Sequence, residues 1–234
     1  MADENLSGLI ASRKILIVDD EKFSRSITTR SVNDITGGTE TVIARDGAEG
    51  LHCLVGRSRE YAAAICDFNM PVMNGLQFLK QVRSGLEGMR NDLPVIMLTG
   101  HSDSALVGAA LKLDVDGFVV KPASLQALQT RLRHALAAPH GVHAPKHYAP
   151  IDVDAISKYL LENKPKQPAG ATSQPRGART ALDEIAPPVT LASDITAHSG
   201  ELLLSAGMVL TPRLLERLRE LAGMKIIEEH VWLE

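Results

Sequence analysis

The sequence contains few aromatic residues, only two cysteines and no long apolar segment. Aromatic residues make up 3% of the chain, too few for a surface that stacks on single-stranded nucleic acid. Cys53 and Cys66 cannot form a disulfide framework or a four-cysteine zinc site. Every apolar run is shorter than the roughly 20 residues that cross a bilayer, and the net charge of −3 gives no electrostatic reason for a nucleic-acid or membrane partner. We therefore expect a cytoplasmic protein.

The composition divides the chain into three parts. Residues 13–138 alternate short apolar runs with amphipathic stretches, and an apolar pattern returns in residues 189–234. Between them, residues 139–188 hold eight of the twelve prolines and show little hydrophobic periodicity. Such a segment buries too little apolar surface to offset the entropy of ordering it. We therefore expect two folded parts joined by a flexible linker, with a short docking helix near residues 153–162.

The first part shows five repeats of an apolar run followed by a helical pattern. The five runs lie at residues 15–18, 41–44, 62–66, 95–98 and 117–120. Runs without polar alternation are typical of parallel strands that helices cover on both faces. The sequence therefore predicts an α/β domain with a doubly wound, five-stranded parallel sheet.

Polar residues follow these runs where each predicted strand ends. They are Asp19, Asp20, Asp67, Thr99 and Lys121. Right-handed crossovers place all these strand ends at one edge of the sheet, where ligands of open α/β sheets bind. Three carboxylates at one edge repel one another unless a cation joins them, and Mg²⁺ is the simplest hard cation with oxygen ligands. An ammonium and a hydroxyl beside them would cradle a phosphoryl group, which an aspartate can accept without a general base.

Four segments together resemble the receiver domain of two-component response regulators. They are Val18–Glu21, Asp67–Gly75, Leu98–Gly100 and Val119–Pro122, and they occur in the order and spacing of that family. The resemblance covers about residues 13–138 and implies a flavodoxin-like fold. It also implies a phosphoacceptor rather than an enzyme that acts on other substrates.

The resemblance implies a role for each matching residue. Asp67 would accept the phosphoryl group, and Lys121 would pair first with Asp67 and then with the phosphoryl group. Thr99 would bond a phosphoryl oxygen, and the Lys121–Pro122 peptide bond would be cis. Phe118 would be the aromatic switch that moves inward with Thr99, although a plain core position is the alternative for this residue.

The resemblance also implies how the Mg²⁺ would be held. Asp20 would bind it directly and Asp19 mainly through water, together with Asp67. Asn69 would supply its backbone carbonyl. His101 is close enough to Thr99 in sequence to contact the phosphoryl group, although a solvated loop histidine is the simpler interpretation.

Four more histidines lie near or in the predicted linker, namely His134, His140, His143 and His147. Their irregular spacing and neighbouring prolines favour solvated side chains over a metal site.

Residues 189–234 predict a small α+β module of strands and one helix. Thr211 and Pro212 predict the helix start, Gly223 its end, and a last strand is expected from Lys225 to about Trp232. The module resembles a β-rich unit found beside receivers and ahead of some cyclic-dinucleotide phosphodiesterase domains. Residues 188–234 contain four basic and seven acidic residues, which disfavours DNA binding.

The sequence as a whole predicts a response regulator that switches protein–protein interaction through its receiver face and C-terminal module. A histidine kinase or phosphotransfer protein would supply the phosphate, a downstream protein would bind in response, and phosphorylation-dependent homodimerisation stays open. We expect neither DNA nor membrane binding. Two alternatives remain. The receiver could regulate a ligand-binding or remnant enzymatic module in cyclic-dinucleotide signalling, or the chain could be a constitutive dimeric adaptor that associates through its Leu214–Leu221 stripe.

Overall fold

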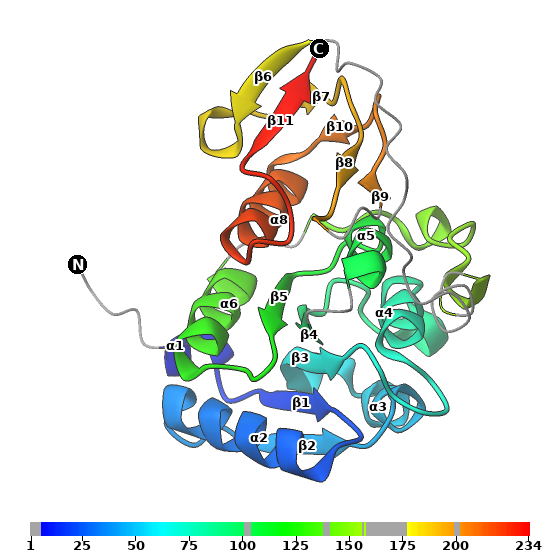
Figure 1. The fold of residues 1–234 in the computed structure, drawn as a ribbon. Helices are drawn as coiled ribbons and strands as arrows, with labels where there is room; N and C mark the ends of the chain where they lie inside the picture. The colour runs from blue at the N-terminus through cyan, green and yellow to red at the C-terminus, as the bar shows by residue number, and fades with distance from the viewer. Residues whose placement is uncertain (1–5, 101–103, 138–140, 156, 158–176, 199–201) are drawn as a thin grey trace. The chain divides into compact units, whose positions relative to one another are not determined.

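The structure is a computed structural model that describes residues 6–100, 104–137, 141–155, 157, 177–198 and 202–234 (Figure 1). Its internal contacts divide the chain into two compact units. The first comprises residues 1–101 and 113–152, and the second comprises residues 102–112 and 153–234. Each unit is described separately below.

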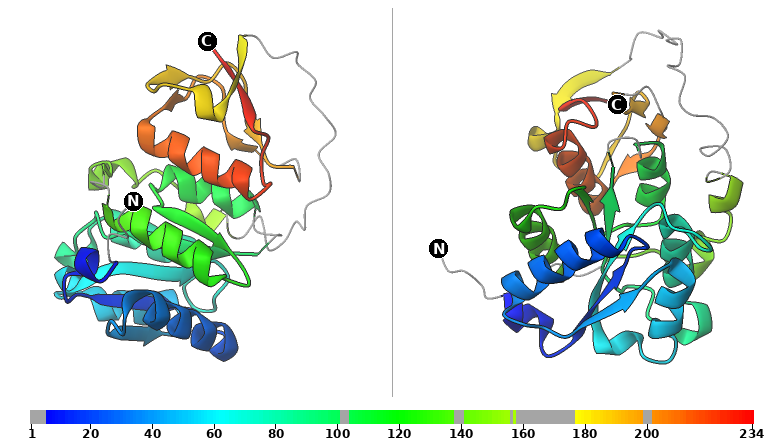
Figure 2. Two further views of the ribbon diagram at one scale, coloured as in Figure 1. Left: turned by 90° about the vertical axis from the view of Figure 1, so that its left-hand side faces the viewer. Right: turned by 60° about the horizontal axis from the view of Figure 1, so that its bottom comes forward.

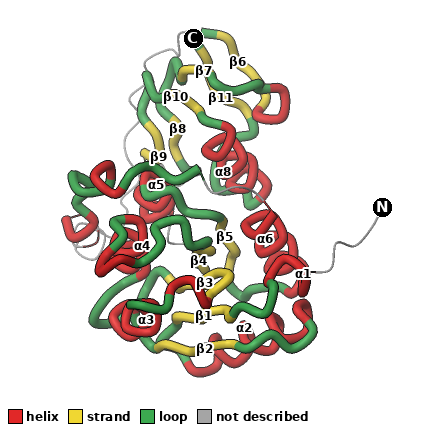
Figure 3. The backbone as a smooth tube through the Cα atoms, turned by 180° about the vertical axis from the view of Figure 1, so that it is seen from behind, coloured by secondary structure: helices red, strands yellow, loops and turns green. Residues whose placement is uncertain are grey.

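The first unit contains a five-stranded sheet in the order β2-β1-β3-β4-β5 (Figure 3). Every neighbouring pair is parallel. The strands are β1 (Lys14–Val18), β2 (Thr41–Ala44), β3 (Tyr61–Asp67), β4 (Val95–Thr99) and β5 (Gly117–Val120). This arrangement confirms the predicted doubly wound sheet. From β1 the chain adds β2 on one side of the sheet and then β3, β4 and β5 on the other side, so the strand order reverses beside β1.

Helices cover the two faces of this sheet (Figure 2). They are α1 (Leu6–Ile10), α2 (Lys22–Thr36), α3 (Gly47–Leu54), α4 (Gly75–Arg83) and α6 (Leu125–Ala137). Helices α1, α2 and α6 share one buried cluster with the strands, which includes Ile10, Val32 and Leu132. On the other face, α3 and α4 approach closely enough that Gly50 lies between Val18 and Phe78. The sheet is therefore buried on both faces, as its apolar strand sequences require.

Helix α4 begins at a tightly packed position directly after the loop that leaves β3. Asn74 and Gln77 form a reciprocal capping box, which satisfies backbone N–H groups at the helix start. The Gly75 N–H donates to the Phe68 carbonyl at 3.0 Å. A Cβ atom at Gly75 would collide with the Asp67 carbonyl oxygen and lie 2.6 Å from Met97 Cε. Only glycine fits here, and the close approach positions the end of β3 against α4.

The second unit consists of helix α5 and the C-terminal elements. Its elements are α5 (Ser104–Lys112), β6 (Ala178–Ala181), β7 (Val189–Thr190), β8 (Ile195–Thr196), β9 (Leu202–Leu204), β10 (Val209–Leu210), α8 (Pro212–Gly223) and β11 (His230–Leu233). The strands form three antiparallel pairs, β6 with β11, β7 with β10 and β8 with β9. Helix α5 contacts β9. Thr211 caps α8 by accepting from the Leu214 N–H, as its sequence predicts.

Two predicted boundaries of the C-terminal module need correction. The module was expected to begin at residue 189, but β6 pairs with β11 along its whole length, so residues 178–181 belong to it. The last strand was expected from Lys225, whereas β11 begins at His230. Lys225 has a left-handed φ of 57°, which places it in a turn rather than a strand.

The expected linker also needs correction at its beginning. Residues 141–152 group with the first unit, and the Tyr148 side chain is fully buried. His143, expected to be solvated, contacts the Asp114 carboxylate. The short helix predicted near residues 153–162 lies largely outside the described residues. Among the helices that the structure describes, none combines the length and apolar character needed to cross a membrane.

Candidate functional site

The structure brings the predicted polar residues together at the carboxyl edge of the sheet. Asp19 follows β1, Asp67 is the last residue of β3, Thr99 is the last residue of β4, and Lys121 follows β5. Asp19, Asp67 and Thr99 are buried, although all three are polar. Because buried polar groups require partners, their contacts show how the site is organised.

The Lys121 ammonium lies between two carboxylates. Its Nζ atom is 2.8 Å from Asp67 Oδ2 and 3.1 Å from Asp19 Oδ2. Burial opposes the charged ammonium, but the bonds to Asp67 and Asp19 outweigh it and raise the pKa of Lys121. Lys121 is therefore a positive charge held over the two acids. The Lys121–Pro122 peptide bond next to it is cis, as the resemblance implied.

Burial dominates the titration of Asp67. It raises the pKa of this carboxyl to about 6, even though the hydrogen bond and charge of Lys121 act in the opposite direction. The neighbouring Asp19 carboxylate adds to the increase. The raised pKa means that Lys121 alone does not fully offset the cost of burying the Asp67 carboxylate. A second cation next to this carboxylate would therefore stabilise its ionised form.

The Asp19 carboxylate is oriented by residues of the following turn and helix. Its Oδ1 accepts from the Glu21 N–H at 2.8 Å, and its Oδ2 accepts from the Ser24 hydroxyl at 2.6 Å. The Arg25 guanidinium donates to the Asp19 carbonyl at 2.7 Å. Sequence analysis did not single out Ser24 or Arg25. Both residues lie in the first turn of α2, a few positions after Asp19, and this short separation could have indicated that their side chains contact Asp19.

Thr99 and Phe118 lie on the two strands nearest to Lys121. The Thr99 hydroxyl donates to the Gly100 carbonyl at 3.0 Å. Phe118 is fully buried, and its ring centroid lies 6.3 Å from that of Phe68 in a stacked arrangement. Asn69 is exposed one residue beyond Phe68. The predicted contact residue His101 lies outside the described residues.

The acidic residues fit a divalent cation. One carboxylate oxygen from each of Asp19, Asp20 and Asp67 lies within 4.8 Å of the others. Asp20 is exposed, whereas the other two are buried, so the cluster opens to solvent on one side. Carboxylate oxygens and retained water are the ligands that Mg²⁺ prefers. The incomplete stabilisation of Asp67 provides an electrostatic reason for binding it.

Mg²⁺ affinity is expected to depend on pH through Asp67. Since its pKa is raised to about 6, the carboxyl is protonated below that pH, and a proton must leave before a cation binds. Affinity should be constant above about pH 7 and fall about tenfold per pH unit well below pH 6. Calorimetric titration between pH 5 and 8 measures this. A wild-type profile as flat as that of Asp67→Asn would contradict the assignment.

Comparison with known proteins agrees with this geometry. A family model described as the response regulator receiver domain matches residues 15–133. The chemotaxis protein CheY homolog of Campylobacter jejuni is 34% identical over 128 residues, covering 55% of this chain and 95% of that protein. The chemotaxis protein CheY of Pseudomonas aeruginosa is 36% identical over 119 residues, covering 51% and 92%.

A solved structure of a response regulator receiver domain protein from Clostridium thermocellum is also similar. It is 26% identical, has a TM-score of 0.46, and the match covers 53% of this chain and 94% of that one. The family match extends over half of the chain and includes all the strand ends that form the acidic site. The chain therefore belongs to the response regulator receiver family of two-component systems.

Proposed function

We propose that Asp67 is the phosphoacceptor of this receiver. Receiver domains accept phosphoryl groups from histidine kinases or phosphotransfer proteins, and Mg²⁺ is their cofactor. The observation that supports Asp67 is the convergence of its carboxylate with Asp19 and Lys121 at the ends of three different strands. Its Oδ2 atom already faces the ammonium that would neutralise an incoming anion.

The transfer step follows from this arrangement. An Asp67 carboxylate oxygen attacks the phosphorus of a phosphohistidine, a P–O bond forms, and the P–N bond breaks with its electron pair retained by the histidine nitrogen. The ionised carboxylate needs no general base. Lys121 moves from the Asp67 oxygen to a phosphoryl oxygen and offsets the charge that builds there. Bound Mg²⁺ supplies further neutralisation of the phosphoryl oxygens.

The remaining residues have supporting roles in this proposal. Asp19, Asp20, Asp67 and the Asn69 carbonyl hold the Mg²⁺. The Thr99 hydroxyl exchanges the Gly100 carbonyl for a phosphoryl oxygen. We retain Phe118 as the switch residue. It is buried on β5, and this strand leads directly into Lys121.

A cavity next to the site suits the docking of a phosphodonor protein. It has a volume of about 330 Å³, and its lining includes Phe23, Ser24, Ile27 and Lys121. Phe23 is 71% exposed, unusually high for a phenylalanine. Because an apolar side chain at the rim of a polar site favours contact with another protein, we assign this surface to the histidine kinase or phosphotransfer protein.

We further propose that the output is protein–protein interaction through the second unit, in the cytoplasm and without DNA. Helix α5 is the next helix after Thr99 in the sequence, and it packs against β9 of the C-terminal module. A movement of Thr99 on phosphorylation would therefore reach the module through the helix that follows it in the chain. In the α8 stripe, Leu215, Leu218 and Leu221 are at most 1% exposed within one chain, which supports a core role over a constitutive dimer surface.

The phosphoacceptor is tested by mass spectrometry with acetyl phosphate and Mg²⁺. Wild type should gain about 80 Da per phosphoryl group, and hydroxylamine, which attacks acyl phosphates, should remove it. Asp67→Asn should gain nothing, because its amide is a poor nucleophile. Asp34→Asn, an exposed aspartate in α2, serves as the matched control and should behave as wild type. Equal labelling of wild type and Asp67→Asn would refute the proposal.

A further inference from the structure

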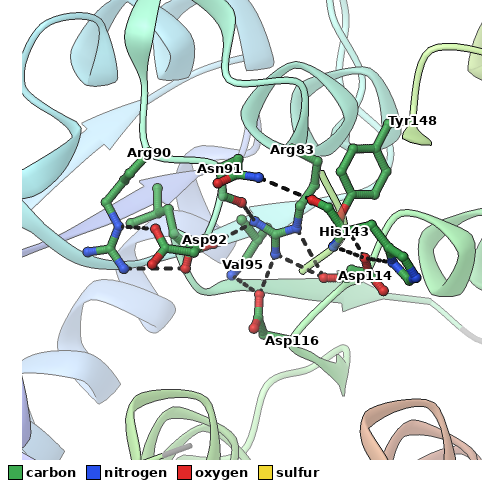
Figure 4. Close-up of polar contacts among 10 residues, drawn as sticks. Arg83, Arg90, Asn91, Asp92, Val95, Asp114, Asp116, His143 and Tyr148 are labelled. Carbon is green, nitrogen blue, oxygen red and sulfur yellow. Dashed lines mark hydrogen bonds and ion pairs between the residues drawn. The ribbon is translucent and has the colours of Figure 1, made fainter. Parts of the chain in front are cut away.

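Residues 141–152 form a segment of the receiver unit, and Figure 4 shows its His143 and Tyr148 beside Asp114. Tyr148 is fully buried, and its hydroxyl donates to Asp114 Oδ2 at 2.6 Å. Three residues further along, the Lys80 ammonium of α4 donates to the Ile151 carbonyl at 2.6 Å. The segment contains two prolines, and Tyr148 is its only buried residue, so these specific contacts rather than a broad apolar face hold it in place.

Asp114 is the central anchor. Its Oδ2 atom also accepts from the His143 N–H at 3.1 Å and lies 2.6 Å from His143 Nδ1. The Asn91 side chain donates to the His143 carbonyl at 3.2 Å. Burial alone would raise the pKa of Asp114, but the hydrogen bonds from Tyr148 and His143 outweigh it and lower the pKa. The carboxylate is thus stabilised as an anion by residues of the segment.

The backbone of Asp114 connects this anchor to the strands. Asp114 has a left-handed φ of 51°, unusual for a residue with a side chain, and its carbonyl accepts from Arg83 at 2.9 and 3.1 Å. Arg83 also donates to Asp116, whose carboxylate accepts from the Val95 N–H at 2.7 Å. Val95 begins β4, and Asp116 directly precedes β5.

The same two strands end at the acidic site. β4 ends at Thr99, and β5 is followed by Lys121. In this structure Lys121 is paired with Asp67, and the Thr99 hydroxyl is bonded to the Gly100 carbonyl. Both groups must leave these partners to bind a phosphoryl group. The two strands next to the segment's anchor therefore carry the residues whose contacts must change when a phosphoryl group binds.

We propose that residues 141–152 are an intramolecular latch that stabilises this resting arrangement through β4 and β5. The inference rests on the proposed function, because it requires that a phosphoryl group binds at Asp67. Coupling between two sites is reciprocal, so the latch must weaken phosphoryl binding by the same factor by which the phosphoryl group loosens the latch.

The test combines hydrogen exchange with binding of beryllofluoride, a phosphoryl analogue, in the presence of Mg²⁺. Tyr148→Phe removes one hydrogen bond to Asp114 and keeps the buried ring. Asp114→Asn removes the charge and retains a residue that tolerates the left-handed conformation. Tyr61→Phe, at the buried start of β3, is the matched control.

Both latch variants should speed exchange in residues 141–152 and tighten beryllofluoride binding about fivefold, while Tyr61→Phe should do neither. Saturating beryllofluoride should speed exchange of the same residues in wild type by a similar factor. Binding that is unchanged in both latch variants, or exchange that beryllofluoride leaves unaltered, would overturn the latch. Failure of wild type to bind beryllofluoride at all would instead refute the proposed function.

Discussion

Replacement of Arg83 by alanine is expected to lower the free energy of unfolding of the receiver unit by about 3–5 kcal/mol. The Arg83 side chain is fully buried, and its partner Asp116 is 3% exposed. Besides this ion pair, Arg83 donates to the carbonyls of Asn91, Leu93 and Asp114. Alanine would leave one buried carboxylate and three carbonyls without this donor, together with a cavity.

Urea denaturation followed by circular dichroism measures the effect. Arg57→Ala is the matched control, because Arg57 makes an exposed ion pair with Glu60 that water readily replaces. Its unfolding midpoint should stay at the wild-type value. If Arg83→Ala unfolded at the same urea concentration as Arg57→Ala, the buried network would contribute little to stability, and the path from Asp114 to Val95 would lose its support.

Substitution of Gly75 by alanine is expected to damage both stability and the acidic site. The new Cβ atom would collide with the Asp67 carbonyl and crowd Met97, so either α4 or the end of β3 must move. Overpacking of this kind costs about 1–3 kcal/mol. Because the backbone that shifts belongs to Asp67 itself, Mg²⁺ affinity should fall by about tenfold or more, since a small misplacement of a ligand is costly.

The comparison for this variant is Gly8→Ala in helix α1, where no atom lies within 4 Å of the added methyl group. Alanine favours helix over glycine, so Gly8→Ala should be neutral or slightly stabilising. Calorimetric Mg²⁺ titration and thermal unfolding of both variants separate the two effects. Unaltered Mg²⁺ binding by Gly75→Ala would show that the β3–α4 approach does not position Asp67.

The sheet and the strand-end residues were predictable because they depend on local pattern and on topology. The runs before Asp19, Asp67 and Lys121 are apolar without interruption, which indicates buried parallel strands, and right-handed crossovers then bring the strand ends to one edge. No three-dimensional information beyond these rules was needed. By contrast, Ser24 orients Asp19 through a contact that only the finished turn creates.

The segment 141–152 was predicted incorrectly for a physical reason. Its composition resembles a linker, and its order comes from one buried tyrosine and from Asp114, a residue 34 positions away from it in sequence. Such a long-range contact leaves no periodic signal in the chain. Strand β6 was missed similarly, because Ala178–Ala181 is weakly apolar and becomes a strand by pairing with β11. The grouping of α5 with the second unit likewise depends on tertiary contact rather than on its own sequence.

The pairing of β6 with β11 has a consequence for how this module can be used in other proteins. Ala178, where the first strand starts, is opposite Leu233, where the last strand finishes, so the polypeptide enters and leaves the module at neighbouring points. A unit whose first and last residues lie close together can be inserted into a surface loop of a host protein without separating the two ends of that loop. Helix α5 belongs to the same unit and contacts β9, so a host protein would also have to supply a surface that replaces α5.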